Sequence, residues 1–160
     1  MQFPADAPLV NPPTPPPPSW IERILWFLPI VGWWIAGLLW SGRMRVKKDQ
    51  IAVQMQRRSQ PTFAQWGDDP QRRQVAVVVS EALKEEFDWP NAHYLPDDPL
   101  SLLIFRDDCE SELVFVLDDV EDRLNLKRLD YALPKTMPDE NTTLGMLVDE
   151  IVKIQRASAR

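Results

Sequence analysis

The side chains able to carry out covalent or metal chemistry are few in this chain of 160 residues. It contains one histidine, His93, and one cysteine, Cys109. A histidine–cysteine couple or a zinc site needs more partners than these two residues supply. Asp107, Asp108 and Glu110 surround Cys109 and oppose formation of its thiolate, so we expect a packing or surface cysteine. The sequence therefore predicts no enzyme, and His93 is interpreted as a hydrogen-bonding loop residue.

Acidic pairs recur at positions 97–98, 107–108 and 118–119. A calcium loop would need its characteristic spacing and a turn glycine, and neither is present. Helix capping and solvation explain these pairs better than a metal site. Gly145 stands alone near a predicted helix start, so a glycine-rich phosphate loop is also missing. We expect neither a metal nor a cofactor.

The longest apolar run extends from Ile24 to Trp40 and carries no charge over seventeen residues. As a helix, residues 19–41 would span roughly 33 Å, enough for a hydrocarbon core of about 30 Å. The run predicts a transmembrane helix over residues 20–41. A monotopic or re-entrant segment bent at Pro29 is the alternative. The residues expected to contact the membrane are Trp20, Ile24, Trp33, Trp34 and Trp40.

The flanks of this run differ in charge. Residues 41–67 carry a net charge of +5 and residues 1–40 a net charge of −1. The positive-inside rule then predicts a single-pass inner-membrane protein with its N-terminus outside and its C-terminal domain in the cytoplasm. The cations expected to contact lipid headgroups are Arg43, Arg45, Lys47 and Lys48.

The chain divides into four parts by composition. Residues 1–19 form a proline-rich tail, which favours an extended spacer over a ligand of a proline-reading domain. The transmembrane helix follows at 20–41, and a basic juxtamembrane linker at 42–67. Residues 68–160 form an acidic domain of net charge −10, which argues against nucleic acid and favours a partner with a basic surface.

Helical spacing dominates the acidic domain, so we expect an all-α fold. A capped helix is predicted from Asp69 to Phe87, ended by Trp89 and Pro90. A second helix follows Asp108, with an apolar stripe and an acidic face, and a third begins near Thr143. The segment 91–105 reads as a long ordered loop, and 126–133 as one or two helical turns. The residues of the acidic face expected to bind a partner are Asp118, Asp119, Glu121 and Asp122.

Two stretches resemble the acyl carrier protein family. Residues 142–151, Thr-Thr-Leu-Gly-Met-Leu-Val-Asp-Glu-Ile, are similar to the closing helix of that family. Residues 112–119, Glu-Leu-Val-Phe-Val-Leu-Asp-Asp, are similar to its acidic recognition helix. The resemblance covers residues 72–156 and implies a small acyl-carrier-like helical bundle. The chain also resembles small bacterial carrier-like proteins without an evident carrier site.

The chain departs from the family at the attachment site. The resemblance implies a phosphopantetheine-bearing serine at the position of Asp107, and a carboxylate cannot hold that arm. Ser111 lies four residues further on, outside the motif. Phosphopantetheine is therefore not expected, with Ser111 as the weaker alternative.

These observations predict a non-catalytic, membrane-tethered interaction module. It would present its acidic helix at the cytoplasmic membrane face to a basic protein, for example an enzyme of lipid or envelope metabolism. Two alternatives stay open. One is a true membrane-anchored acyl carrier protein modified at an unconventional serine. The other is a membrane-embedded regulator or immunity-type protein that binds a toxin or transporter through residues 24–40.

Overall fold

The chain is described by a computed structural model that places residues 7–13, 31–59, 63–104, 109–126, 129, 133 and 141–158. Helices are the only regular elements across these ranges, so the predicted all-α class is confirmed. The elements are α2 (Val31–Gln56), the 3-10 helix η1 (Phe63–Trp66), α3 (Pro70–Phe87), α4 (Leu100–Leu103), α5 (Cys109–Leu124) and α7 (Leu144–Ser158). The chain forms two compact units, one of residues 1–9 and 54–160 and the other of residues 10–53.

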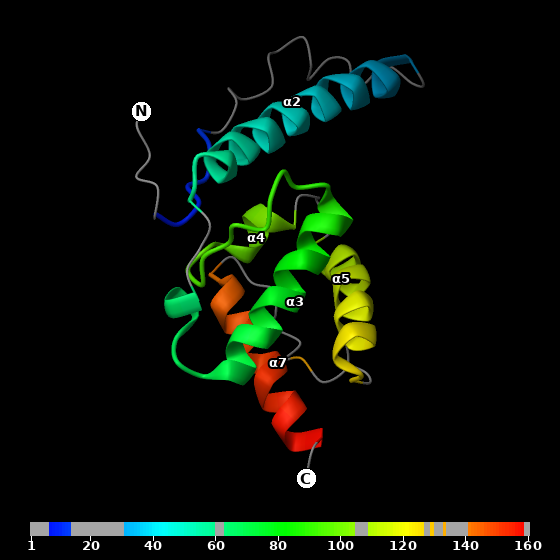
Figure 1. Ribbon diagram of the computed structural model, residues 1–160. Helices are drawn as coiled ribbons and strands as arrows, with labels where there is room; N and C mark the ends of the chain where they lie inside the picture. The colour runs from blue at the N-terminus through cyan, green and yellow to red at the C-terminus, as the bar shows by residue number, and fades with distance from the viewer. Residues whose placement is uncertain are drawn as a thin grey trace. The chain divides into compact units, whose positions relative to one another are not determined.

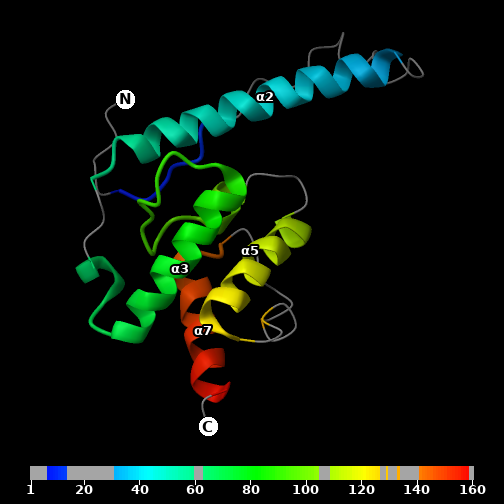
Figure 2. The ribbon, with the colours of Figure 1, turned by 45° about the vertical axis from the view of Figure 1, so that its right-hand side comes forward.

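The core of the larger unit lies where α3 packs against both α5 and α7 (Figure 1). The same three helices stay side by side when the view is turned (Figure 2). Each contributes the apolar stripe predicted from its spacing. The buried members are Val75, Val79, Ala82, Leu83, Leu113, Val116, Leu117, Val120, Leu144, Leu147, Val148 and Ile151.

Helix α3 begins and ends where the sequence predicts. The side chain of Asp69 accepts a hydrogen bond from the backbone N–H of Gln71 at 3.0 Å, and Pro70 occupies the first turn. At the other end Asp88 adopts a left-handed conformation, with φ of 51°. The indole N–H of Trp89 donates to the carbonyl of Leu103 at 3.0 Å, so this buried ring fixes the chain after the helix.

The segment predicted as a loop contains the short helix α4. Leu100, Leu102 and Leu103 are buried there, so the apolar residues expected to anchor a loop form a helical turn instead. The preceding residues meet the start of α7. Leu144 N–H donates to the carbonyl of Asp98 at 2.9 Å, and Gly145 N–H to that of Pro96 at 2.7 Å. These bonds satisfy N–H groups that lack a partner inside α7.

Gly145 is required by this close approach. A Cβ atom at that position would lie 2.9 Å from the carbonyl oxygen of Pro96, closer than real Cβ contacts allow. The glycine of the stretch that resembles the carrier family therefore has a packing role here.

Helix α2 extends beyond the boundaries predicted for the apolar segment. It continues through residues 42–56, which the sequence analysis treated as a linker. Residues 20–30 of the predicted transmembrane segment lie outside the described residues. Within the ranges that the structure describes, no helix combines the length and the apolar character needed to cross a bilayer.

Part of the proline-rich tail, residues 7–9, packs in the larger unit. Leu9 is buried, its backbone N–H donates to Asp98 Oδ1 at 2.8 Å, and the carbonyl of Ala7 accepts from Arg58 Nη2 at 2.6 Å.

Candidate functional site

The surface of α5 is the site that the sequence analysis singled out. Asp118 and Asp119 lie three and four residues after Phe115, and Asp122 lies four residues after Asp118, so all four share one face of the helix. Phe115 is 58% exposed, and Asp118 and Asp122 are exposed beside it. We call these four residues the α5 stripe. The acidic residues were predicted, whereas the exposed aromatic side chain that leads them was not.

Arg123 links the α5 stripe to α3 through ion pairs with residues of both helices. Its guanidinium donates to Asp119 Oδ1 at 2.9 Å, to Glu85 Oε2 at 2.6 Å and to Glu81 Oε2 at 3.4 Å. The hydrogen bond to Asp119 is the main cause of a raised pKa for Arg123; slight desolvation opposes it, and Glu85 adds to it. Asp119 is therefore partly neutralised within the protein. Asp118 and Asp122 have no ion pair among the described residues, so they carry the negative charge of the stripe.

Glu121 has a structural role that was not predicted. It is half-buried, and its Oε1 accepts a hydrogen bond from the backbone N–H of Leu129. Leu129 is buried and its carbonyl accepts from Leu133 N–H at 2.9 Å, as in a helical turn. Glu121 therefore holds the segment after α5 in place. The partner-binding role predicted for Glu121 stays a prediction.

Other predicted site residues are only partly described. Asp107, Trp20 and Ile24 lie outside the described residues. Ser111 lies in the first turn of α5. The remaining predicted membrane residues are all in α2, namely Trp33, Trp34, Trp40, Arg43, Arg45, Lys47 and Lys48. Of the cations, Arg45 is exposed, whereas Lys47 and Lys48 are half-buried.

A buried ion pair was missed altogether. The guanidinium of Arg58 donates to both carboxylate oxygens of Asp98, at 2.6 and 2.7 Å, and the Asp98 side chain is fully buried. Arg58 also donates to the carbonyls of Ala7 and His93, and Asp98 accepts from the N–H groups of Leu9 and Leu95. Asp98 is therefore a buried carboxylate paired with Arg58, and solvation does not account for it. No group of side chains suited to a metal ion occurs in the described ranges.

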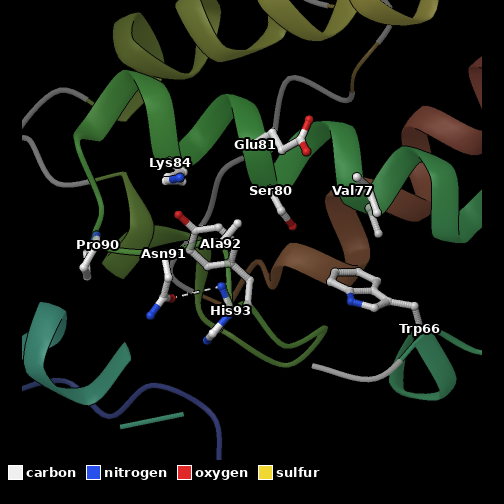
Figure 3. A pocket seen from close by; sticks show the side chains of 11 residues that line it. Trp66, Val77, Ser80, Glu81, Lys84, Pro90, Asn91, Ala92 and His93 are labelled. Carbon is white, nitrogen blue, oxygen red and sulfur yellow. Dashed lines mark hydrogen bonds between the residues drawn. The ribbon is translucent and has the colours of Figure 1, made fainter. Parts of the chain in front are cut away.

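A cavity of about 410 Å³ lies between α3 and the segment 90–94 (Figure 3). Val77, Ser80 and Lys84 come from α3, and Trp66 and His93 lie across from them. His93 is a hydrogen-bonding loop residue, as predicted: its N–H donates to Asn91 Oδ1 at 3.0 Å, and its Nδ1 lies 3.3 Å from the carbonyl of Arg58. The sequence contained no signal for this cavity, because its lining comes from segments without a shared periodicity.

Comparisons with protein-family models, with curated proteins and with solved structures gave no match to this chain.

Proposed function

We propose that this protein is a non-catalytic, carrier-like interaction module attached to the cytoplasmic face of a membrane. In this proposal the α5 stripe binds a partner protein with a basic surface. The observation that carries the proposal is the exposure of Phe115 at the head of a row of carboxylates. The order of helices, with an acidic α5 between α3 and α7, agrees with the resemblance to acyl carrier proteins.

The composition of the stripe supports a protein partner. Aromatic side chains are enriched at the centre of protein interfaces, where they contribute most of the binding energy. Exposed carboxylates around such an anchor steer a basic partner toward it and accelerate association. A row of carboxylates would repel nucleic acid, because binding to phosphates needs a positive surface.

The apolar run from Ile24 to Trp40 supports attachment to a membrane. Ala7 and Leu9 form hydrogen bonds with Arg58 and Asp98, so both ends of the apolar segment must lie on the same side of the membrane for these bonds to form. They therefore favour a re-entrant or monotopic segment over a single crossing. The exposed side chain of Arg45 is suited to lipid headgroups on that side. We therefore propose that both termini are cytoplasmic.

Site-directed photocross-linking tests the interaction. A photoreactive phenylalanine analogue at position 115 should give a discrete adduct in cells that produce the full chain. The double reversal Asp118→Lys with Asp122→Lys should abolish that adduct. The matched control, Glu86→Lys with Asp97→Lys, makes the same charge change at exposed residues outside α5 and should leave the adduct unchanged. An adduct insensitive to the reversal at α5, or no adduct at position 115, would contradict the proposal.

Reporter fusions test the topology. A reporter active only in the cytoplasm should give signal when fused before Met1 and when fused after Arg160. Signal from the second fusion alone would indicate a single crossing, and the hydrogen bonds of Ala7 and Leu9 could not then form.

A further inference from the structure

Residues 7–9 are bound by the larger unit in the way that a protein binds a short peptide. Arg58 Nη2 donates to the carbonyl of Ala7 at 2.6 Å, and the N–H of Leu9 donates to Asp98 Oδ1 at 2.8 Å. The Leu9 side chain is buried, with 4% of the residue exposed. We call residues 7–9 the strap, and Arg58 with Asp98 its seat. The seat therefore holds the strap by one carbonyl, one N–H and one aliphatic side chain.

The seat does not depend on the strap for its own ion pair. The guanidinium of Arg58 donates to both oxygens of Asp98, at 2.6 and 2.7 Å. Arg58 also donates to the carbonyl of His93 at 3.2 Å, and Asp98 Oδ2 accepts from the N–H of Leu95 at 2.8 Å. Opening of the strap would leave both charges paired, and water could take the two vacated positions. It would not create the unpaired buried charge that is so costly in a protein.

The interactions that hold the strap are few. Two hydrogen bonds and one buried leucine side chain oppose the conformational entropy that three ordered residues lose. These contributions are of similar size, which favours local opening of the strap while the rest of the larger unit stays folded. An open strap leaves a seat that is already arranged to bind a peptide, and such preorganisation lowers the cost of binding.

The bound strap displays the chemistry that the seat recognises. An extended peptide must offer a carbonyl at one position and, two residues later, an N–H together with an aliphatic side chain. Pro8 lies between these positions, is exposed and has no N–H that needs a partner. Proline also keeps itself and the preceding residue extended, so less entropy is lost on binding. A free peptide with the same three residues presents the same groups to Arg58 and Asp98.

We propose that the seat is a binding site for an extended peptide that carries a proline followed by a leucine, supplied by another molecule. The strap is then a competitor built into the chain, which occupies the site until it opens. This inference does not depend on the α5 stripe or on the partner proposed for it.

Titration of the full-length Leu9→Ala chain tests the proposal, because this variant weakens the strap and frees the seat. The probe is a capped peptide of residues 5–13, and the matched ligand is the same peptide with Leu9→Ala. Nuclear magnetic resonance should show saturable binding of the probe, with a Kd on the order of 1 mM for so small a contact. The matched ligand should bind at least about tenfold more weakly, because it lacks the side chain that the strap buries. Equal affinities, or no saturable binding of the probe, would overturn the proposal.

The unmodified chain tests the competition. It should bind the probe at least about fivefold more weakly than the Leu9→Ala chain does, since its own strap occupies the seat for most of the time. Val10→Ala is the matched control chain, because it truncates the neighbouring side chain, which is 50% exposed. This control should bind the probe as the unmodified chain does. Equal affinities of the Leu9→Ala and unmodified chains would mean that the probe binds away from the seat, which contradicts the proposal.

Hydrogen exchange in the unmodified chain gives a readout that needs no variant. The N–H groups of Leu9 and Leu95 both belong to buried residues and bind the two oxygens of Asp98 at the same distance, 2.8 Å. If the strap opens while the seat stays intact, the protection factor of Leu9 should be at least about a hundredfold lower than that of Leu95. Equal protection of the two groups would show that the strap opens only when the whole unit unfolds, and the proposal would then fail.

Discussion

At the scale of single residues, Arg58 and Asp98 impose the strongest constraint. Both side chains are almost entirely removed from water, and each also binds backbone groups from segments distant in sequence. Removing one partner from a buried ion pair leaves an uncompensated charge, which is more costly than the net gain from the pair itself. This pair therefore fixes how residues 7–9, 58 and 93–98 meet.

Replacement of Asp98 tests this constraint. Asp98→Ala should lower the free energy of unfolding by about 3–5 kcal/mol, because Arg58 stays buried without its counter-charge. Urea unfolding followed by circular dichroism measures the change. Asp68→Ala is the matched control, since it removes a carboxylate paired with Arg73 on the surface and should have little effect. A loss below about 1 kcal/mol at Asp98 would mean that the pair is not buried in solution.

Gly145 gives a second prediction at this scale. Gly145→Ala should destabilise the protein by about 1–3 kcal/mol, since the added methyl group would press on the carbonyl of Pro96. Gly42→Ala in α2 is the control, because nothing lies within 4 Å of the position of its Cβ. Alanine there should be neutral or slightly stabilising. Equal effects of the two substitutions in urea unfolding would contradict the close approach of α7 to Pro96.

At the scale of elements, α3 depends on its N-terminal cap. Asp69 is partly desolvated, which raises its pKa. The hydrogen bond from Gln71 N–H and the positive charge of Arg156 outweigh this effect, so the net pKa is lowered. A carboxylate whose pKa is lower in the folded state stabilises the fold at pH values above its pKa in the unfolded state. This contribution is lost as the pH falls through its pKa in the folded state.

The pH dependence of the Asp69→Asn variant tests this cap. Asparagine can still cap the helix but carries no charge, so the variant should be less stable than the unmodified chain at neutral pH. That difference should be constant near neutrality and shrink below about pH 4, near the unfolded value of a carboxyl group. Chemical unfolding at a series of pH values measures it, with Asp97→Asn as an exposed control. A difference that persists unchanged to pH 3 would exclude ionised Asp69 as its source.

At the scale of the whole molecule, the larger compact unit joins segments from both ends of the chain. The change in charge suggested a boundary at residue 68, but the unit includes residues 1–9 and 54–67. The basic segment, residues 42–67, also stabilises the fold. Its Arg58 is buried in an ion pair with Asp98 and is therefore not available to lipid headgroups.

Two fragments distinguish these boundaries. A fragment of residues 67–160 lacks Arg58, so Asp98 would be buried without a counter-charge. It should be less stable than a fragment of residues 54–160 by about 3–5 kcal/mol. Urea unfolding of the two purified fragments makes the comparison. Equal stabilities would show that residues 54–66 are not part of the unit.

The sequence by itself determined the helices whose signals are local. The cap at Asp69, the stop at Trp89 and the apolar stripes of α3, α5 and α7 depend on residues within a few turns of one another, so spacing alone was sufficient. The exposure of Asp118 and Asp122 followed from the same periodicity. The apolar run from Ile24 to Trp40 is also a property of the sequence alone.

The tertiary structure decided everything that joins distant segments. Arg58 pairs with Asp98 across forty residues, Gly145 meets Pro96, and Glu121 accepts from the N–H of Leu129. The cavity at Tyr94 likewise depends on how α3 meets the segment 90–94. Such contacts produce no periodic pattern in the sequence, because the residue that a charge, a hydroxyl or a glycine contacts depends on how distant elements pack together. An aspartate or glutamate can cap a helix, bind a partner or pair with a buried arginine. The residue type alone does not distinguish these roles, because they depend on the neighbours that the fold brings close.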